Sequence, residues 1–181
     1  MSDGPRFDVV VRPEREADFE AISEVVRLAF RSHVEERIVR DIRASDYYIP
    51  GLALVATVDD RVVGHVMVSY TDLDTGAGRE QIPMLSPLAV HPGRQGEGIG
   101  GRLVREEIER ADARGEPLII LEGSPLYYPR FGFRYSVPEG IVIHLPDWAP
   151  PEAAMMIPLT AYRPELRGTV VYPPAFDAAT P

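Results

Sequence analysis

The sequence predicts one domain of mixed α/β class, with helices on the flanks of a central sheet. Segments rich in β-branched residues, typical of strands, alternate with segments whose apolar residues recur at the three-to-four spacing of a helix. A chain of 181 residues, 45% of them hydrophobic, is long enough to bury one sizeable core. We find no internal repeat and no linker. We expect a core over residues 7–136, C-terminal strands over 137–173 and a loose tail over 174–181.

The chain is expected to begin with a strand and two helices. Residues 7–12 are rich in β-branched side chains and are followed by Pro13, which favours a strand. From Glu14 onward the apolar residues fall on one helical face, and a second such face follows. Both helices are expected to cover the sheet. Their apolar residues are Phe19, Ile22, Val25, Val26, Ala29 and Phe30 in the first, and Val34, Ile38, Val39 and Ile42 in the second.

Apolar runs predict the remaining strands. The stretch 51–58 is apolar on both alternating faces, as expected of a central strand that is covered on each side. A tight turn at Asp59-Asp60 joins it to the next strand, and a loop is expected over 72–79. Pro87 lacks a donor and indicates a bulge or an edge. The expected strands are 51–58, 61–70, 81–90 and 117–121, then short ones at 141–145, 154–159 and 169–172, with a helix that ends at Gly115.

Composition excludes several classes of function. Without Cys there is no disulfide framework and no thiol nucleophile, and without Lys there is no Schiff-base or P-loop lysine. The net charge of −9, with no cluster of Arg, argues against a nucleic-acid partner. Because the apolar runs are too short to cross a bilayer and no signal peptide is present, we expect a cytoplasmic protein with no membrane partner. The four histidines lack metal-ligand spacing, so no metal site is predicted. His65 is expected to be a satisfied histidine of the sheet.

A glycine-rich turn lies between the predicted strand 81–90 and the next helix. Such a turn gathers unpaired backbone N–H groups and the positive end of a helix dipole, which together favour an anion. Five glycines in nine positions exceed what helix capping requires, because a phosphate must approach the main chain without meeting a Cβ atom. We therefore interpret the turn as a phosphate site. The glycines are Gly93, Gly96, Gly98, Gly100 and Gly101.

A dinucleotide-binding protein is an alternative interpretation of this turn. Gly96-x-Gly98-x-x-Gly101 matches the Rossmann fingerprint, and Glu122 stands where a ribose-binding acid is expected. In that fingerprint the glycines follow the strand at once, whereas five residues intervene here. After Glu122 no crossover helix is predicted that could continue a parallel sheet. NAD binding is thus the least favoured interpretation.

Two motifs stand in order along the chain, separated by a predicted helix and strand. They are Gln95-x-x-Gly98-x-Gly100 after a Leu88-x-Val90 strand, and Tyr127-Tyr128-Pro129-Arg130-Phe131-Gly132-Phe133. The first resembles the acyl-CoA pyrophosphate loop of the GNAT superfamily of N-acetyltransferases. The second is similar to that superfamily's aromatic–Tyr pair, which is followed after two residues by a hydrophobe-Gly-Phe sequence. The resemblance to the superfamily covers residues 7 to about 133. The sequence Leu121-Glu122-Gly123-Ser124-Pro125 before Tyr127 resembles a bacterial branch of mostly uncharacterised predicted acetyltransferases.

The resemblance implies a GNAT-like acyl-CoA N-acyltransferase fold, whose mixed, mostly antiparallel sheet has splayed fourth and fifth strands. These would be 81–90 and 117–121, with Pro87 as the cause of the splay. The pantetheine arm of acetyl-CoA would pair with the main chain of Leu88 and Val90, one of whose amides would polarise the thioester carbonyl. The further cofactor-binding residues implied are Ala89, Arg94, Gln95, Gly96, Glu97, Gly98, Ile99, Gly100, Gly101, Ser124 and Arg130.

The resemblance also implies a reaction. Tyr128 matches the family's tyrosine that protonates the departing CoA thiolate, and Glu122, at the end of the fifth strand, is our candidate general base. The family often has an Asn and an Ala before the aromatic–Tyr pair, where this chain has Ser124-Pro125-Leu126.

The expected function is transfer of an acetyl group from acetyl-CoA to a primary amine of a small molecule or peptide, by direct attack in a ternary complex. The alternative is an acyl-CoA-binding module without turnover. Acceptor pockets in such folds come from the early helices, the region of strands 6 and 7, and loops. The proline-rich C-terminal strands offer a surface for a homodimer.

Overall fold

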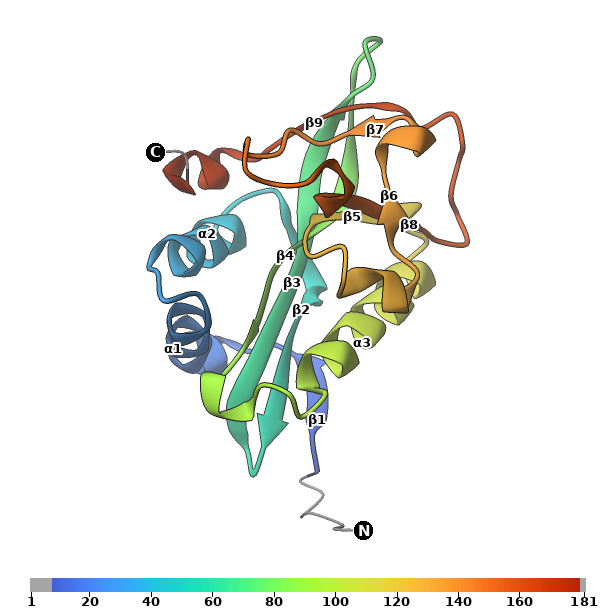
Figure 1. Ribbon diagram of the computed structural model, residues 1–181. Helices are drawn as coiled ribbons and strands as arrows, with labels where there is room; N and C mark the ends of the chain where they lie inside the picture. Colours follow the sequence, from blue (N-terminus) through green and yellow to red (C-terminus); the bar gives the residue numbers. More distant parts are fainter. Residues whose placement is uncertain (1–7, 180–181) are drawn as a thin grey trace.

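The computed structural model describes residues 8–179, in which nine strands form one sheet flanked by helices (Figure 1). The main path of the sheet runs β1-β2-β3-β4-β5-β8-β6, and β9 pairs with β3 and with β7. Only β4–β5 and β7–β9 are parallel pairs. The predicted mixed, mostly antiparallel sheet with flanking helices is confirmed.

The elements have the following bounds. The strands are β1 (Val10–Pro13), β2 (Tyr48–Val58), β3 (Arg61–Asp74), β4 (Arg79–Val90), β5 (Leu118–Glu122), β6 (Arg134–Tyr135), β7 (Ile141–Val142), β8 (Ala154–Pro158) and β9 (Gly168–Val171). The α-helices are α1 (Phe19–Phe30), α2 (Val34–Arg43) and α3 (Ile99–Ala113). The 3-10 helices are η1 (Glu16–Asp18), η2 (Pro92–Arg94), η3 (Tyr128–Phe131), η4 (Val137–Glu139), η5 (Pro151–Ala153) and η6 (Pro174–Ala179).

The helices cover opposite faces of the sheet, α1 and α2 on one and α3 on the other (Figure 1). Along β2 the side chains alternate between the two cores: Ala53 and Val55 pack with α1 and α2, whereas Leu54 and Ala56 pack with α3. The prediction of a central strand that is covered on both sides is confirmed. No helix within residues 8–179 is long and apolar enough to span a bilayer.

A buried polar cluster ties the end of β1 to α2 and β3. The Glu14 carboxylate accepts hydrogen bonds from Arg43 (2.8 Å to each oxygen), the Tyr48 hydroxyl (3.0 Å) and His65 Nε2 (3.1 Å). Burial raises the pKa of Glu14, but the hydrogen bonds from Arg43 and His65 outweigh burial and hold this pKa at about 2. His65 lies in the sheet and is paired through Nε2, whereas its buried Nδ1 has no hydrogen-bond partner among the described residues, so the predicted satisfied histidine is confirmed for one ring nitrogen only. The expected helix start at Glu14 was wrong, because Glu14 faces this cluster and α1 begins only at Phe19.

A bulge in β4 lies where β4 and β5 separate and leave a gap in the sheet. Val66 pairs with Leu88 and Val68 with Leu85, so two residues of β4, Ser86 and Pro87, lie opposite a single residue of β3. On its other side β4 pairs with β5 at one position only, Met84 with Ile120. The two strands then separate, so the splay predicted from Pro87 is confirmed.

The ribbon of β3 and β4 is longer than predicted. A loop was expected over residues 72–79, but pairing continues to Asp74 opposite Arg79. The reason is long-range: β9 pairs with Asp72–Asp74 and supplies hydrogen bonds to a polar segment that has no strand signal of its own.

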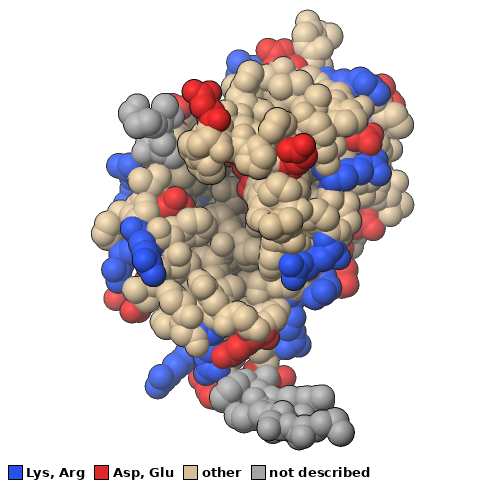
Figure 2. Space-filling view, in the orientation of Figure 1, with Lys and Arg blue, Asp and Glu red and all other residues tan. Residues whose placement is uncertain are grey.

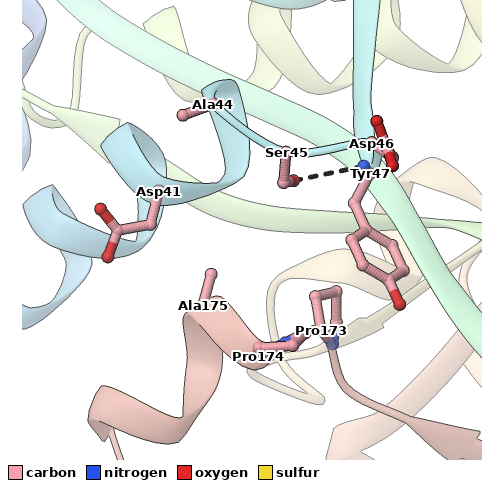
Figure 3. A pocket seen from close by; sticks show the side chains of 8 residues that line it. All are labelled: Asp41, Ala44, Ser45, Asp46, Tyr47, Pro173, Pro174 and Ala175. Atoms are coloured by element: carbon pink, nitrogen blue, oxygen red, sulfur yellow. Dashed lines mark hydrogen bonds between the residues drawn. The ribbon is translucent and has the colours of Figure 1, made fainter.

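The C-terminal segment is not the loose tail that we predicted. Residues Pro174–Ala179 form η6, and Phe176 packs against the apolar clusters on both sides of it. Figure 3 shows Pro173, Pro174 and Ala175 facing Asp41 and Ala44 at the end of α2 across a shallow pocket. Packing against a helix far away in the sequence thus orders this segment. Residues 180 and 181 of the expected tail lie outside the described residues.

Candidate functional site

The gap between β4 and β5 exposes main-chain groups of β4. The His91 amide donates to the Val63 carbonyl of β3 at 2.8 Å. Because successive residues of an antiparallel strand turn their amides to alternate sides, Val90 and Leu88 direct theirs into the gap. The Val90 carbonyl accepts a hydrogen bond from the Gln95 side chain (3.1 Å). These are the two positions whose main chain was predicted to face a ligand.

Ala89 does not share this arrangement. By the same alternation its main chain faces β3, where it pairs with His65, and its buried methyl group packs with α1 and α2. Ala89 thus turns neither its main chain nor its side chain into the gap, and the geometry disfavours its predicted cofactor-binding role. The motif placed it between two residues of the gap, but a strand turns every second residue away.

The turn before α3 presents the first amides of a helix. Gly98 caps α3 with φ of +81°, Gly96 has φ of +84°, and the first helical bond runs from Arg102 N to the Gly98 carbonyl (3.1 Å). The amides of the three preceding residues, Ile99 to Gly101, therefore have no partner within the helix. Positive φ at Gly96 and Gly98 explains why glycine is needed there. We call the hollow over these amides the α3 slot; Leu88, Val90, Arg94, Gln95, Gly96, Gly98, Ile99, Gly100, Gly101, Arg105, Tyr127, Arg130 and Phe131 line it.

Two further glycines keep the α3 slot open. A Cβ atom on Gly100 would lie 2.9 Å from the Tyr127 hydroxyl oxygen, and one on Gly101 would lie 3.3 Å from Arg105 Nη1. Side chains at these positions would fill the space above the helix N-terminus. The slot thus has the features of an anion cradle: bare amides, a helix dipole and room above them.

Arginines surround the α3 slot. The Arg130 Nε donates to the Tyr127 carbonyl (2.8 Å) and its guanidinium stands 4.7 Å from the Tyr127 ring centre. Arg105 lies 5.2 Å from the Phe131 ring centre, and Arg94 pairs with Glu97 at 3.3 Å. Among the described residues no acidic side chain lines the slot, since Glu97 is turned toward Arg94. Arg105 was not predicted as a site residue, although its position one turn after Gly101 places it on the same helical face.

Tyr128 stands at the other end of the gap. Its ring lies directly on Gly123, where a Cβ atom would come within 2.3 Å of Tyr128 Cε2. The Tyr127 and Phe133 rings meet it edge-on at 5.0 and 5.7 Å. Burial, with a smaller contribution from Tyr127, raises the pKa of Tyr128 to about 12. Its hydroxyl has no hydrogen-bond partner among residues 8–179, so it is a neutral donor available to a ligand.

Glu122 ends β5 beside this tyrosine and is held by Tyr172. The Tyr172 hydroxyl donates to Glu122 Oε1. Burial raises the pKa of Glu122 above its ordinary value, and the hydrogen bond from Tyr172 opposes this rise. The residue as a whole remains exposed. Burial and the nearby Glu122 charge in turn raise the pKa of Tyr172. Tyr172 follows β9, and no local sequence pattern predicted it as a site residue. Only the pairing of β9 with β3 brings it to Glu122.

Glu122 and Tyr128 line a cavity of about 670 Å³, which we call the Glu122 cavity. Leu88 lines both this cavity and the α3 slot, so the two hollows adjoin at β4. Figure 2 shows a hollow in the face between α1–α2 and α3, with mostly uncharged walls. The other residues that line the cavity are Phe30, Glu35, Ile38, Met84, Leu85, Ser86, Pro87, Gly123, Ser124, His144, Leu145, Pro146, Tyr172 and Phe176.

Ser124 has a structural use at the wall of this cavity. Its carbonyl accepts from the Tyr127 and Tyr128 amides (3.0 and 3.3 Å), and its hydroxyl accepts from the Leu126 amide (3.3 Å). It therefore anchors the turn that positions Tyr128.

Comparison with known proteins agrees with this geometry. Residues 10–136 match the sequence profile of the acetyltransferase (GNAT) domain. The chain belongs to the GNAT acetyltransferase family. The uncharacterized N-acetyltransferase YjhQ of Escherichia coli K12 is 31% identical over 165 residues, which cover 85% of this chain and 86% of that protein. The uncharacterized N-acetyltransferase YhbS of the same organism is 32% identical over 129 residues, or 71% of this chain and 75% of YhbS.

Solved structures of GNAT proteins share the whole architecture. The crystal structure of Escherichia coli YhbS in complex with CoA superposes with a TM-score of 0.84 at 26% identity, covering 98% of this chain and 96% of YhbS. A GNAT acetyltransferase from Brucella melitensis, in complex with acetyl-CoA, has a TM-score of 0.76 at 30% identity and covers 95% of this chain and all of that chain (100%). The GNAT fold of this protein therefore includes the C-terminal strands that the resemblance of motifs left unmatched.

Proposed function

We propose that this GNAT protein transfers the acetyl group of acetyl-CoA to a primary amine of a small molecule or peptide, by direct attack within a ternary complex. The observation that carries the proposal is the pair of hollows that adjoin at Leu88 of β4. One has bare amides and arginines suited to a diphosphate, and the other has a neutral phenol and a carboxylate suited to moving protons.

The residues present fit acetyl-CoA. The open amides of Ile99 to Gly101, with Arg105 and Arg130, would hold the diphosphate, and the main chain of Leu88 and Val90 would pair with the pantetheine arm. Gln95 would contribute to cofactor binding indirectly, because its side chain donates a hydrogen bond to the Val90 carbonyl. When bound, acetyl-CoA supplies an activated acyl thioester. An amide of β4 that points into the gap is suited to donate to an oxygen that gains negative charge there.

Glu122 is the proposed general base. An attacking amine must lose a proton, and a carboxylate with a raised pKa binds that proton better than one with the ordinary pKa of glutamate. The hydrogen bond from Tyr172 holds the Glu122 carboxylate in one orientation and limits the rise in its pKa.

Tyr128 is the proposed donor to the departing thiolate. With a pKa of about 12 the phenol is neutral at pH 7 and can donate a hydrogen bond to sulfur. A thiol has a pKa of about 8.5, so complete transfer of the phenol proton is uphill. Tyr128 therefore stabilises the thiolate chiefly by this hydrogen bond while the proton released by the amine becomes available.

Two measurements test the proposal in sequence. Calorimetric titration with acetyl-CoA and CoA should show binding, and release of CoA should then be detected with members of a broad panel of primary amines. Absence of binding at millimolar cofactor would refute the proposal. Binding without CoA release across the panel would instead support an acyl-CoA-binding module without turnover.

A further inference from the structure

The Glu122 cavity contains a second carboxylate that the proposed reaction does not use. Glu35 lies in the first turn of α2 and lines the cavity beside Phe30 and Ile38. Its Oε2 atom is enclosed by protein and has no hydrogen-bond partner within the described part of the chain. No described side chain donates a hydrogen bond to this oxygen or forms an ion pair with Glu35, so a small movement of the side chain would let the oxygen accept from a donor that a ligand brings into the cavity.

The remainder of the cavity does not supply that partner. Its lining includes two glutamates and no arginine among the described residues, and its one basic side chain is His144. The chain as a whole carries a net charge of −9, which adds to the attraction of cations into a concave site. A ligand is therefore the source of positive charge that the cavity can accept.

One carboxylate is enough for the reacting amine. That amine must be neutral when it attacks, and Glu122, held by Tyr172, stands beside Tyr128 to take its proton. Glu35 reaches the cavity from α2, together with the apolar side chains Phe30 and Ile38, so it is left for a group that stays charged. Phe176 and Leu145 extend the apolar wall.

We infer that the acceptor carries two cationic groups joined by an apolar chain, one amine that is acetylated near Glu122 and a second positive group that binds Glu35. This inference rests on the proposed acetyltransferase function and defines its substrate class. The second cation can belong to a free diamine or to a basic side chain next to a peptide amine, and these sources share the chemistry that Glu35 recognises.

Matched acceptors test the inference. Steady-state kinetics with acetyl-CoA would compare α,ω-diaminoalkanes of three to ten carbons with the alkylamines and amino alcohols of equal length. A second arm would compare alanyl-lysine amide with alanyl-norleucine amide. Each acceptor is measured with the wild-type protein, with Glu35→Gln, and with Glu36→Gln. Glu36 is a neighbour on α2 that pairs with His33 at 3.0 Å and does not line the cavity.

We expect kcat/KM for the dication of at least one pair to exceed that for its monocation by about tenfold or more in the wild type, chiefly through KM. In Glu35→Gln that ratio should fall to within about twofold, and Glu36→Gln should keep it. The arm that shows the preference identifies the source of the second cation. An equal kcat/KM within every pair, or a preference that survives in Glu35→Gln, would overturn the inference.

A binding measurement separates this inference from the proposed function. Calorimetric titration of the CoA-loaded protein with a diaminoalkane measures binding of the dication in the absence of turnover. Glu35-dependent binding with no acetylation would support the inference and contradict the proposed function. If no dication is acetylated and none binds, the inference is overturned, even if CoA itself binds.

Discussion

The α3 slot and the Glu122 cavity share Leu88 in their walls, yet they consist of different groups. The slot presents main-chain amides and arginines, all from one continuous stretch of chain and the aromatic segment beside it. The cavity presents carboxylates and hydroxyls from α2, β5, η3 and the segment after β9. Main-chain recognition constrains where glycine must stand, whereas side-chain recognition can draw on any element that folding brings near. The slot therefore has a sequence signature, and most of the cavity has none.

The largest effect should come from closing the slot. Gly100→Val places a branched side chain where even a Cβ atom alone would lie 2.9 Å from the Tyr127 hydroxyl oxygen. We expect affinity for CoA to fall by more than about 100-fold, measured by calorimetry. Gly93→Ala is the control, because Gly93 stands in the same turn but outside the lining of the slot. Unchanged affinity in Gly100→Val, with an unchanged circular dichroism spectrum, would place the cofactor elsewhere.

Removing the hydroxyl of Tyr128 should slow catalysis without weakening the binding of CoA. Tyr128→Phe keeps the ring that packs on Gly123 but loses the free hydroxyl. We expect kcat to fall by about 100-fold, with the dissociation constant for CoA changed less than twofold. Tyr135→Phe, in β6 and outside both lining sets, serves as the control. Equal turnover by Tyr128→Phe and wild type would remove Tyr128 from the mechanism.

The charge of the slot should make cofactor binding sensitive to salt. Arg105→Ala is expected to weaken CoA binding by about tenfold and to flatten its dependence on ionic strength, because one cation next to the phosphates is lost. Arg102→Ala removes an exposed arginine of the same helix that does not line the slot, and it should have little effect. A similar loss of CoA affinity in the two variants would show that CoA binding depends only on the overall charge of α3 and not on the position of Arg105.

A smaller effect should appear as a shift on the pH axis. The Tyr172 hydrogen bond lowers the pKa of Glu122 against the effect of burial, so Tyr172→Phe should raise that pKa. Because the base acts only when ionised, the acidic limb of the kcat/KM profile should move to higher pH, by about one unit. With the same acceptor and cofactor, the wild type supplies the reference profile. Superimposed acidic limbs would assign the limb to a group other than Glu122.

Several features of the fold and the slot were predictable because their causes are local. Pro87 marks the bulge in β4, the alternating apolar residues of β2 mark a strand that is covered on both sides, and Gly96 and Gly98 mark positive φ before α3. Each of these signals depends on residues within one turn or one strand.

The errors have the opposite cause. The extension of β3 to Asp74 depends on β9, and the order of η6 depends on α2, so neither could be detected from neighbouring residues. The geometry likewise disfavours the cofactor-binding role predicted for Ala89, which stands inside the motif, because the pleat of β4 turns it into the core.

By itself, the sequence determined the mixed α/β class, the glycine turn before α3 and the aromatic segment with Tyr128, since contiguous residues encode backbone conformation directly. Only the tertiary structure decided which side chains line the Glu122 cavity. Tyr172 meets Glu122 across 50 positions of the chain, and Glu35 enters the same cavity from a helix of the opposite half. Strand pairing and helix packing bring these groups together, and such contacts leave no pattern at either position alone.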